Sequence, residues 1–392
     1  MSIFIKMKKI LKPLFGLICG AAIGYIGIML VMWLVGDDQQ AVESSSETIN
    51  YGRLVFGIIT TLTFLVLSIF LHIILHEIGH LITGLLTGYK FISFRAFHLT
   101  LINTEKGLKW KRFFIQGTAG QCLLDLPEDQ DMKKVPWFWY NAGGVLINLL
   151  LTVISIVVLH IFNLSVLPQT FFIMFAFVGI AMALLNGIPM VAGGVSNDGN
   201  NILVLWRHPE LRVIMARSLQ IVGMLSRGKR PKELPKEWFA CNPVNDKCNY
   251  IEFTARINYM AWLEDQGKLD EARQVAEEIM AVGKQLPQLL FNEVCGERVM
   301  LELLTLNRPE VVQQLWTKSI AQYTETNGKY SAMKKAVLFT YELLYKQNAK
   351  QANTYKQYLL QHQQDYTMPG EVLTALYLIG LAEDKMPQIE SK

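Results

Sequence analysis

The sequence predicts a mainly α-helical protein: a polytopic transmembrane helical bundle with a small β-hairpin insertion, followed by a soluble α-helical, repeat-like domain. Long apolar runs are confined to the first half of the chain, whereas the second half is rich in Lys, Glu and Gln and has helical periodicity. The 51% hydrophobic content therefore averages two different environments. We expect a transmembrane domain over residues 1–225, a linker over 226–248 and a cytoplasmic helical domain over 249–392.

Four stretches are apolar enough to cross a bilayer as helices, which takes roughly 20 residues each. They are residues 13–35, 54–86, 138–163 and 169–189. Lysines precede the first stretch, so a signal peptide is the alternative there. Its apolar run is too long for a signal peptide, however, and no clear cleavage site of small residues follows. We interpret it as an uncleaved span.

The distribution of Lys and Arg between the loops predicts the orientation of these spans. The N-terminus and the segment between the second and third spans are basic, whereas residues 36–53 hold four carboxylates against the single Arg53. Basic loops stay in the cytoplasm, and an even number of spans returns the chain to the side where it began. We therefore expect a multi-pass protein of the cell membrane, embedded in the lipid bilayer, with both termini in the cytoplasm.

The second span ends in the pattern H-E-x-x-H, formed by His76, Glu77 and His80. On a helix, residues four apart share one face, so both imidazoles can bind one Zn²⁺ while Glu77 reaches a zinc-bound water as general base. Ionisable groups cost at least ~2.5–3.5 kcal/mol at the centre of a bilayer and are rare there without a function or a partner. The pattern predicts a zinc centre near the cytoplasmic side, with His72, one turn earlier, as a packed neutral side chain.

A catalytic zinc usually has three protein ligands and one open position. Asp198 is the best candidate for the third ligand, because it lies in a Gly-containing turn beyond the fourth span. The predicted topology places this turn on the same side of the membrane as His80. An ordinary Asp-Gly turn is the alternative interpretation.

These segments resemble the three signatures of the site-2 protease family of intramembrane zinc metalloproteases. The matching segments are His76–His80, Gly144–Asn148, and Asn186–Pro189 with Asp198-Gly199. The resemblance covers about the first half of the chain. It implies zinc ligation by His76, His80 and Asp198, with Glu77 as the catalytic base.

The resemblance also implies substrate-binding roles for three further residues. Asn148 would help to polarise or position the scissile carbonyl, and Asn186 and Pro189 would shape a groove for an extended substrate strand. Asn148 has a second interpretation, as a residue that makes hydrogen bonds between helices. The chain departs from the family pattern because Asn197 precedes Asp198, where Leu is common, and Gly187 follows Asn186, where Pro is common.

Residues 89–117 contain two aromatic and β-branched segments separated by a turn that includes Gly107, which predicts a β-hairpin. A sheet edge beside the zinc could bind an extended substrate by strand addition. A connecting hairpin without substrate contact is the alternative, and both interpretations stay open at this point.

The C-terminal half has a self-similar pattern with a period of about 40 residues. The matching segments are Gly267–Ala272, Asn307–Val312 and Gln347–Ala352. Repeated helix pairs indicate a small solenoid that resembles tetratricopeptide-type repeats, and this resemblance implies a peptide or protein partner. A plain helical bundle that stabilises the enzyme is the alternative.

Composition excludes several classes of function. The net charge of +4 is small and there is no basic stripe interleaved with aromatics, so nucleic acid is not an expected partner. Five cysteines without CxxC spacing favour reduced thiols over disulfides or a Cys-type zinc site.

We therefore expect an intramembrane zinc-dependent endopeptidase that hydrolyses membrane-embedded or membrane-associated protein or peptide substrates. A non-catalytic membrane scaffold or peptide receptor with a structural or vestigial metal site is the alternative. The intact Glu77 argues against it, because a structural zinc needs no base.

Overall fold

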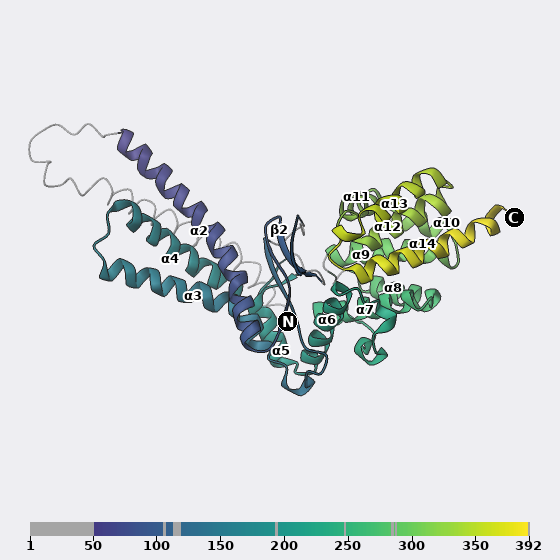
Figure 1. Ribbon diagram of the computed structural model, residues 1–392, viewed down its shortest axis with the longest axis horizontal. Coiled ribbons are helices and arrows are strands. Elements are labelled where there is room, and N and C mark those ends of the chain that lie inside the picture. Colours follow the sequence, from purple (N-terminus) through teal and green to yellow (C-terminus); the bar gives the residue numbers. More distant parts are fainter. Residues whose placement is uncertain are drawn as a thin grey trace, which may run out of the picture. The chain divides into compact units, whose positions relative to one another are not determined.

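A computed structural model describes residues 51–390, except 105–106, 113–118, 193–194, 247, 284–285 and 287. Helices dominate this part of the chain, together with a small antiparallel sheet (Figure 1). The mainly helical class predicted from the sequence is confirmed. The span expected over residues 13–35 lies outside the described residues.

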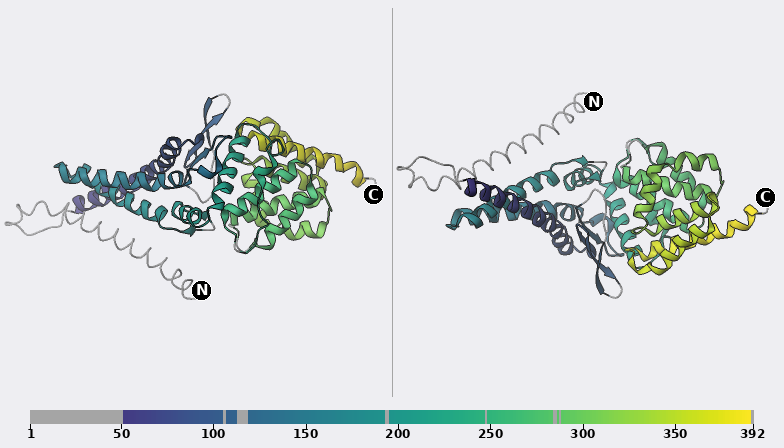
Figure 2. Two further views of the ribbon diagram at one scale, coloured as in Figure 1. Left: turned by 90° about the horizontal axis from the view of Figure 1, so that it is seen from below. Right: turned by 90° about the horizontal axis from the view of Figure 1, so that it is seen from above.

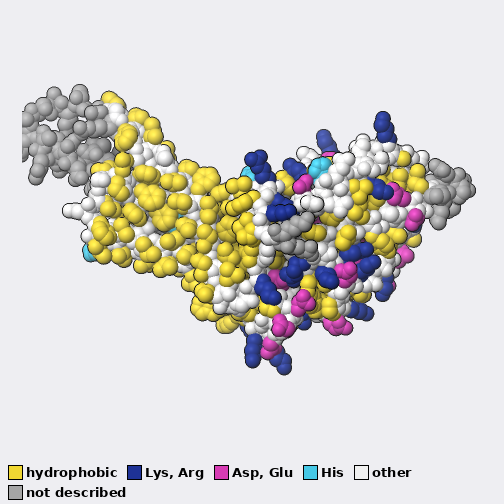
Figure 3. All heavy atoms as spheres, viewed as in Figure 1, with side chains coloured by type: hydrophobic (Ala, Val, Ile, Leu, Met, Phe, Trp, Pro, Cys, Tyr) yellow, Lys and Arg dark blue, Asp and Glu magenta, His cyan; other side chains and the backbone are white. Residues whose placement is uncertain are grey.

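Three helices in the described part of the chain are long and apolar enough to cross a membrane. They are α2 (Tyr51–Leu86), α3 (Trp137–Ile161) and α4 (Val166–Gly187). A helix satisfies its own backbone hydrogen bonds, which hydrocarbon cannot do, so long apolar runs in a bilayer become helices. Figure 3 shows hydrophobic side chains gathered over the surface of these helices, whereas charged side chains are spread over the rest of the visible face.

The contacts within the chain divide it into two units. One comprises residues up to Leu75 and Ile147–Ala183, and the other comprises His76–Leu146 and Leu184–Lys392. In the first unit, the rings of Phe64 and Phe171 pack edge to face with centroids 5.6 Å apart. The three residues that resemble zinc ligands all belong to the second unit.

Four antiparallel strands form the sheet of the second unit, in the order β3-β2-β1-β4. They are β1 (Lys90–Ala96), β2 (Leu99–Thr104), β3 (Gly107–Arg112) and β4 (Gly120–Asp125). The predicted turn at Gly107 joins β2 and β3. The first aromatic segment of the predicted hairpin, residues 91–95, lies instead in β1, which pairs with β2 and β4. Strand β4 pairs with β1, with Phe94 opposite Cys122. This pairing is non-local, so no turn signal in the sequence indicates it.

One face of the sheet carries a buried apolar cluster that includes Cys122 and Leu124 of β4, with Tyr89, Val135 and Ala216 from outside the sheet. Beyond α4, the short strands β5 (Val191–Ala192) and β6 (Val195–Ser196) pair and lead into two helices. These are α5 (Asp198–Arg207) and α6 (Glu210–Ser226). The end of α2, the sheet and α5 thus belong to one unit.

The segment expected to be a linker, 226–248, is packed rather than extended. It contains two turns of 3-10 helix, Pro231–Glu233 and Lys236–Phe239. Leu234, Phe239 and Val244 are buried in the same cluster as Phe253 of the following helix. A segment rich in Lys and Pro thus contributes apolar side chains to the core of the helical part.

The helices that follow this segment build the C-terminal part of the chain (Figure 2). They are α7 (Tyr250–Asp265), α8 (Leu269–Ala281), α9 (Gln288–Leu304), α10 (Pro309–Leu315), α11 (Lys318–Asn327), α12 (Ala332–Thr340) with the π-helical turn Tyr341–Tyr345, α13 (Ala349–Gln361) and α14 (Pro369–Glu390). Their buried faces form two apolar clusters, one centred on α7 to α9 and one on α9 to α14.

The self-similar segments of the sequence coincide with three similar helix-to-helix turns. The turn residues Gly267, Asn307 and Gln347 have φ of 75°, 49° and 52°. Five residues later, each segment has a side chain with no exposed surface; these are Ala272, Val312 and Ala352. The same left-handed turn and the same buried position therefore recur at the period seen in the sequence.

Gln347→Gly is expected to stabilise the protein by about 0.5–1 kcal/mol. A non-glycine residue in the left-handed region costs about 1–2 kcal/mol, and the extra freedom of glycine in the unfolded chain offsets part of that gain. Asn307→Gly should have a smaller effect, because Asn tolerates this conformation. Thermal unfolding of the full chain in detergent would measure both. Gln357→Gly, in the middle of α13, should instead destabilise by about 1 kcal/mol. Equal losses at positions 347 and 357 would contradict the left-handed turn.

Candidate metal centre

His76, His80 and Asp198 bring three metal-binding atoms to one point. The Nε2 atoms of His76 and His80 are 3.2 Å apart. Asp198 Oδ2 lies 3.0 Å from the Nε2 of His76 and 3.4 Å from that of His80. In a tetrahedral zinc site, bonds of about 2.0–2.1 Å place the ligand atoms about 3.3 Å apart. Their spacing therefore fits one zinc ion with one position left open.

The surroundings of these three residues also fit a metal. His76 and His80 are 7% and 8% exposed. The Nδ1 of His80 lies 2.7 Å from the backbone oxygen of Tyr140, which can accept a hydrogen bond from a protonated Nδ1. In that tautomer the Nε2 lone pair faces the centre. Such a hydrogen bond is typical of a metal-binding histidine. Among the residues that the structure describes, this is the one group of three or more His, Cys, Asp and Glu with convergent ligand atoms.

Asp198 is held in its ionised form, as a metal ligand must be. Burial alone would raise the pKa of the Asp198 carboxyl, but the adjacent imidazoles of His76 and His80 lower that pKa to about 2. Asp198 is the first residue of α5, where the positive end of the helix dipole also favours a carboxylate.

Two glycines of α3 allow it to approach α2 closely. A Cβ atom added to Gly144 would lie 2.4–2.6 Å from atoms of the His76 ring, and one added to Gly143 would lie 2.4 Å from the Gly79 backbone oxygen. Small residues permit such close helix packing in membranes. The glycine pair therefore provides the space for the His76 imidazole.

Glu77 lies against the first residues of β4. The backbone N–H of Cys122 donates a hydrogen bond to the Glu77 carboxylate. A Cβ atom added to Gly120 would lie 2.5 Å from Glu77 Oε1, so only glycine fits there without a shift. The start of β4 thus fixes the position of the Glu77 side chain.

The hydrogen bonds of β4 affect whether a substrate could bind to the edge of the sheet by strand addition. Cys122 donates its N–H to Glu77, and its backbone oxygen accepts a hydrogen bond of 3.0 Å from the Tyr140 hydroxyl. Both polar groups of Cys122 on the β4 edge nearest Glu77 are therefore used. Strand addition at this position would have to displace them, which favours a supporting role for β4. The other edge of the sheet is β3.

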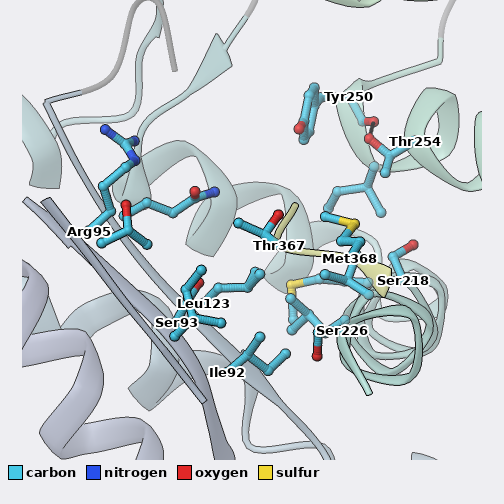
Figure 4. Close-up of a pocket in the computed structure, with 17 residues that line it drawn as sticks. Ile92, Ser93, Arg95, Leu123, Ser218, Ser226, Tyr250, Thr254, Thr367 and Met368 are labelled. Atoms are coloured by element: carbon cyan, nitrogen blue, oxygen red, sulfur yellow. Dashed lines mark hydrogen bonds between the residues drawn. The ribbon is translucent and has the colours of Figure 1, made fainter. Parts of the chain in front are cut away.

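Arg95 of β1 fixes the start of β4. Its guanidinium donates to the backbone oxygens of Phe97 and Gly120, both at 3.2 Å, and it is 1% exposed. Arg95 also borders a cavity of about 310 Å³, which the sheet lines with Ser93 and Leu123, among others. Figure 4 shows the other walls of this cavity, formed by α6, the start of α7 and residues just before α14; labelled side chains there include Ser218, Tyr250 and Met368.

The residues predicted to bind substrate lie on α3 and at the end of α4. Asn148 is fully buried, and its Oδ1 lies 3.1 Å from the Nδ1 of His72, whose Nε2 lies 2.9 Å from the Phe175 backbone oxygen. This arrangement matches the interhelical interpretation of Asn148 and the packed interpretation of His72. Asn186 is partly buried near the end of α4, and Pro189 is exposed just beyond it.

Sequence reasoning missed the residues that support the centre: Gly120, Cys122, Tyr140 and Arg95. The close packing of α3 against His76 was also missed, although the adjacent Gly143 and Gly144 in an apolar span could have indicated it. The other supporting contacts join segments that are distant in sequence.

Comparisons with protein-family models, with curated proteins and with solved structures found no match to this chain.

Proposed function

We propose that this chain is an intramembrane zinc-dependent endopeptidase that hydrolyses peptide bonds of membrane-embedded or membrane-associated protein or peptide substrates. The observation that carries the proposal is the convergence of His76, His80 and Asp198 at the end of an apolar helix, with Glu77 fixed beside them. Zinc bound there would polarise the scissile carbonyl and activate the attacking water.

Glu77 supplies the proton transfers of this reaction. Its carboxylate accepts a proton from the water whose oxygen bonds to the carbonyl carbon. When the C–N bond breaks, the same proton passes to the leaving amine, so Glu77 returns to its ionised form. The hydrogen bond from the Cys122 N–H holds the carboxylate in place through both steps.

The membrane setting supports an intramembrane rather than a soluble protease. Three helices could cross a bilayer, and the two histidines lie within one of them. We propose the cell membrane as the location, with both termini and the centre on the cytoplasmic side, as the charged loops of the sequence predict. The C-terminal helix pairs would then be a tetratricopeptide-like domain that binds a protein or peptide partner, such as the substrate.

The alternative is a scaffold or peptide receptor with a structural metal site. A structural zinc site is normally closed by four protein ligands, whereas three ligand atoms converge here. The glycine at position 120 and the Cys122 N–H also make a specific place for Glu77, for which a structural site has no use. Both observations favour the protease.

Metal removal is expected to abolish cleavage. The purified protein should bind about one zinc per chain and cleave at least one member of a panel of membrane-associated peptides. Treatment with 1,10-phenanthroline should reduce cleavage to background, because the three ligands alone do not activate water, and added Zn²⁺ should restore it. The non-chelating 1,7-isomer serves as the control. Full turnover by zinc-free protein would sink the proposal and favour the scaffold.

A further inference from the structure

The side chain of Asn197, which immediately precedes Asp198, makes four hydrogen bonds to backbone groups. Its Oδ1 accepts from the N–H groups of Met190 and Asn200, both at 2.9 Å. Its Nδ2 donates to the backbone oxygens of Leu185 and Ile188, both at 2.7 Å. An amide side chain has two donor hydrogens and one carbonyl oxygen with two lone pairs, so all of these are used.

These four bonds join three successive segments of the chain. Leu185 is in the last turn of α4, Ile188 and Met190 follow that helix, and Asn200 is in the first turn of α5. The backbone N–H of Asn197 also donates to the Met190 oxygen at 3.1 Å. These hydrogen bonds tie together the two ends of the segment that contains β5 and β6, directly before the Asp198 carboxylate.

Gly199 fixes the other side of Asp198. A Cβ atom added at Gly199 would lie 2.1 Å from the backbone oxygen of Gly187, the last residue of α4. The start of α5 therefore touches the end of α4 directly. Asp198 lies between one neighbour that is hydrogen-bonded to the last turn of α4 and another that is packed against it, so its position follows that of this turn.

We propose that Asn197 is a positioning residue that holds Asp198 in place as the third zinc ligand. Asp at this position would keep the two acceptor functions and lose both donors, whereas Leu or Ala would lose all four bonds. The inference rests on the metal centre of the proposed function but not on proteolysis. It gives a physical role to the position at which this chain departs from the site-2 protease pattern.

The zinc affinity of the full chain in detergent tests this role, measured by competition with a chromophoric chelator and without any cleavage assay. Asn197→Ala and Asn197→Leu should raise the zinc Kd by about 10–100-fold, as is typical when a residue that supports a metal ligand is lost. Asn197→Asp should raise it by a smaller factor. The control is Asn200→Ala, in the same helical turn, which removes one side-chain bond to Ser196 and should leave the Kd unchanged.

A wild-type zinc Kd in Asn197→Leu would overturn the proposal. If the Ala and Leu variants do not fold, Asn197→Asp decides: a raised Kd supports the role, and an unchanged Kd overturns it. Thermal unfolding of the zinc-free variants separates a loss of fold from a loss of affinity. Zinc binding by the wild type without any cleavage would remove the protease function alone, whereas no zinc binding would overturn the metal centre and this role together.

Discussion

Glu77→Gln is expected to abolish peptide cleavage while zinc stays bound. Gln has nearly the same size as Glu, and its amide oxygen can still accept the hydrogen bond from the Cys122 N–H. It cannot accept a proton from the attacking water, however. Loss of a general base typically lowers the rate by about 10²–10⁴-fold. Turnover and zinc content should be measured on the same preparation, against the peptide that wild-type protein cleaves best.

Glu128→Gln is the matched control, because this exposed carboxylate follows β4 and lies outside the centre. It should cleave like the wild type. Equal turnover by Glu77→Gln and wild type would exclude Glu77 as the base and leave the scaffold as the better interpretation. Loss of zinc in Glu77→Gln would instead show that the carboxylate supports the metal ligands.

The core of the candidate metal centre could be predicted from the sequence because it depends on local geometry. His76 and His80 are one helical turn apart, and an apolar run ensures the helix. Asp198 required one further step, the orientation of the spans. The structure brings all three together.

The supporting residues could not be predicted, because each acts through a contact with a distant segment. Cys122 reaches Glu77 only because β4 pairs with β1 and begins beside Glu77. Tyr140 supports His80 through a hydrogen bond to its backbone oxygen, a group that every residue possesses. Asn197 looked like a departure from a family motif, and its role depends on four backbone groups that the sequence does not place.

The fold shows the same division between local and non-local information. The limits of α2, α3 and α4 lie within three residues of the predicted spans 54–86, 138–163 and 169–189. The packing of 226–248 was missed because Leu234, Phe239 and Val244 are spaced without helical or strand periodicity among polar residues. Their burial depends on surfaces provided by later helices.

Gly144→Ala is expected to remove zinc from the protein. The added Cβ would lie 2.4–2.6 Å from three atoms of the His76 ring, far inside van der Waals contact. The imidazole would have to rotate away from the centre, because the backbones of α2 and α3 are themselves in close contact at Gly143. Loss of a residue that supports a metal ligand typically lowers metal affinity by about 10–100-fold. We expect zinc affinity to fall by at least that factor and cleavage to fall with it. Chelator competition and metal content would measure the first effect.

Gly120→Ala provides the complementary case, because its Cβ would lie 2.5 Å from the Glu77 oxygen and not beside a zinc ligand. It should lose cleavage and keep zinc, whereas Gly144→Ala should lose both. Gly380→Ala, where no atom lies within 4 Å of the added Cβ, controls for the substitution itself and should change neither. If Gly144→Ala kept wild-type zinc affinity, His76 could not occupy the described position. Equal loss of zinc in Gly144→Ala and Gly120→Ala would contradict the assignment of separate roles, in which α3 supports the ligand His76 and β4 supports the base Glu77.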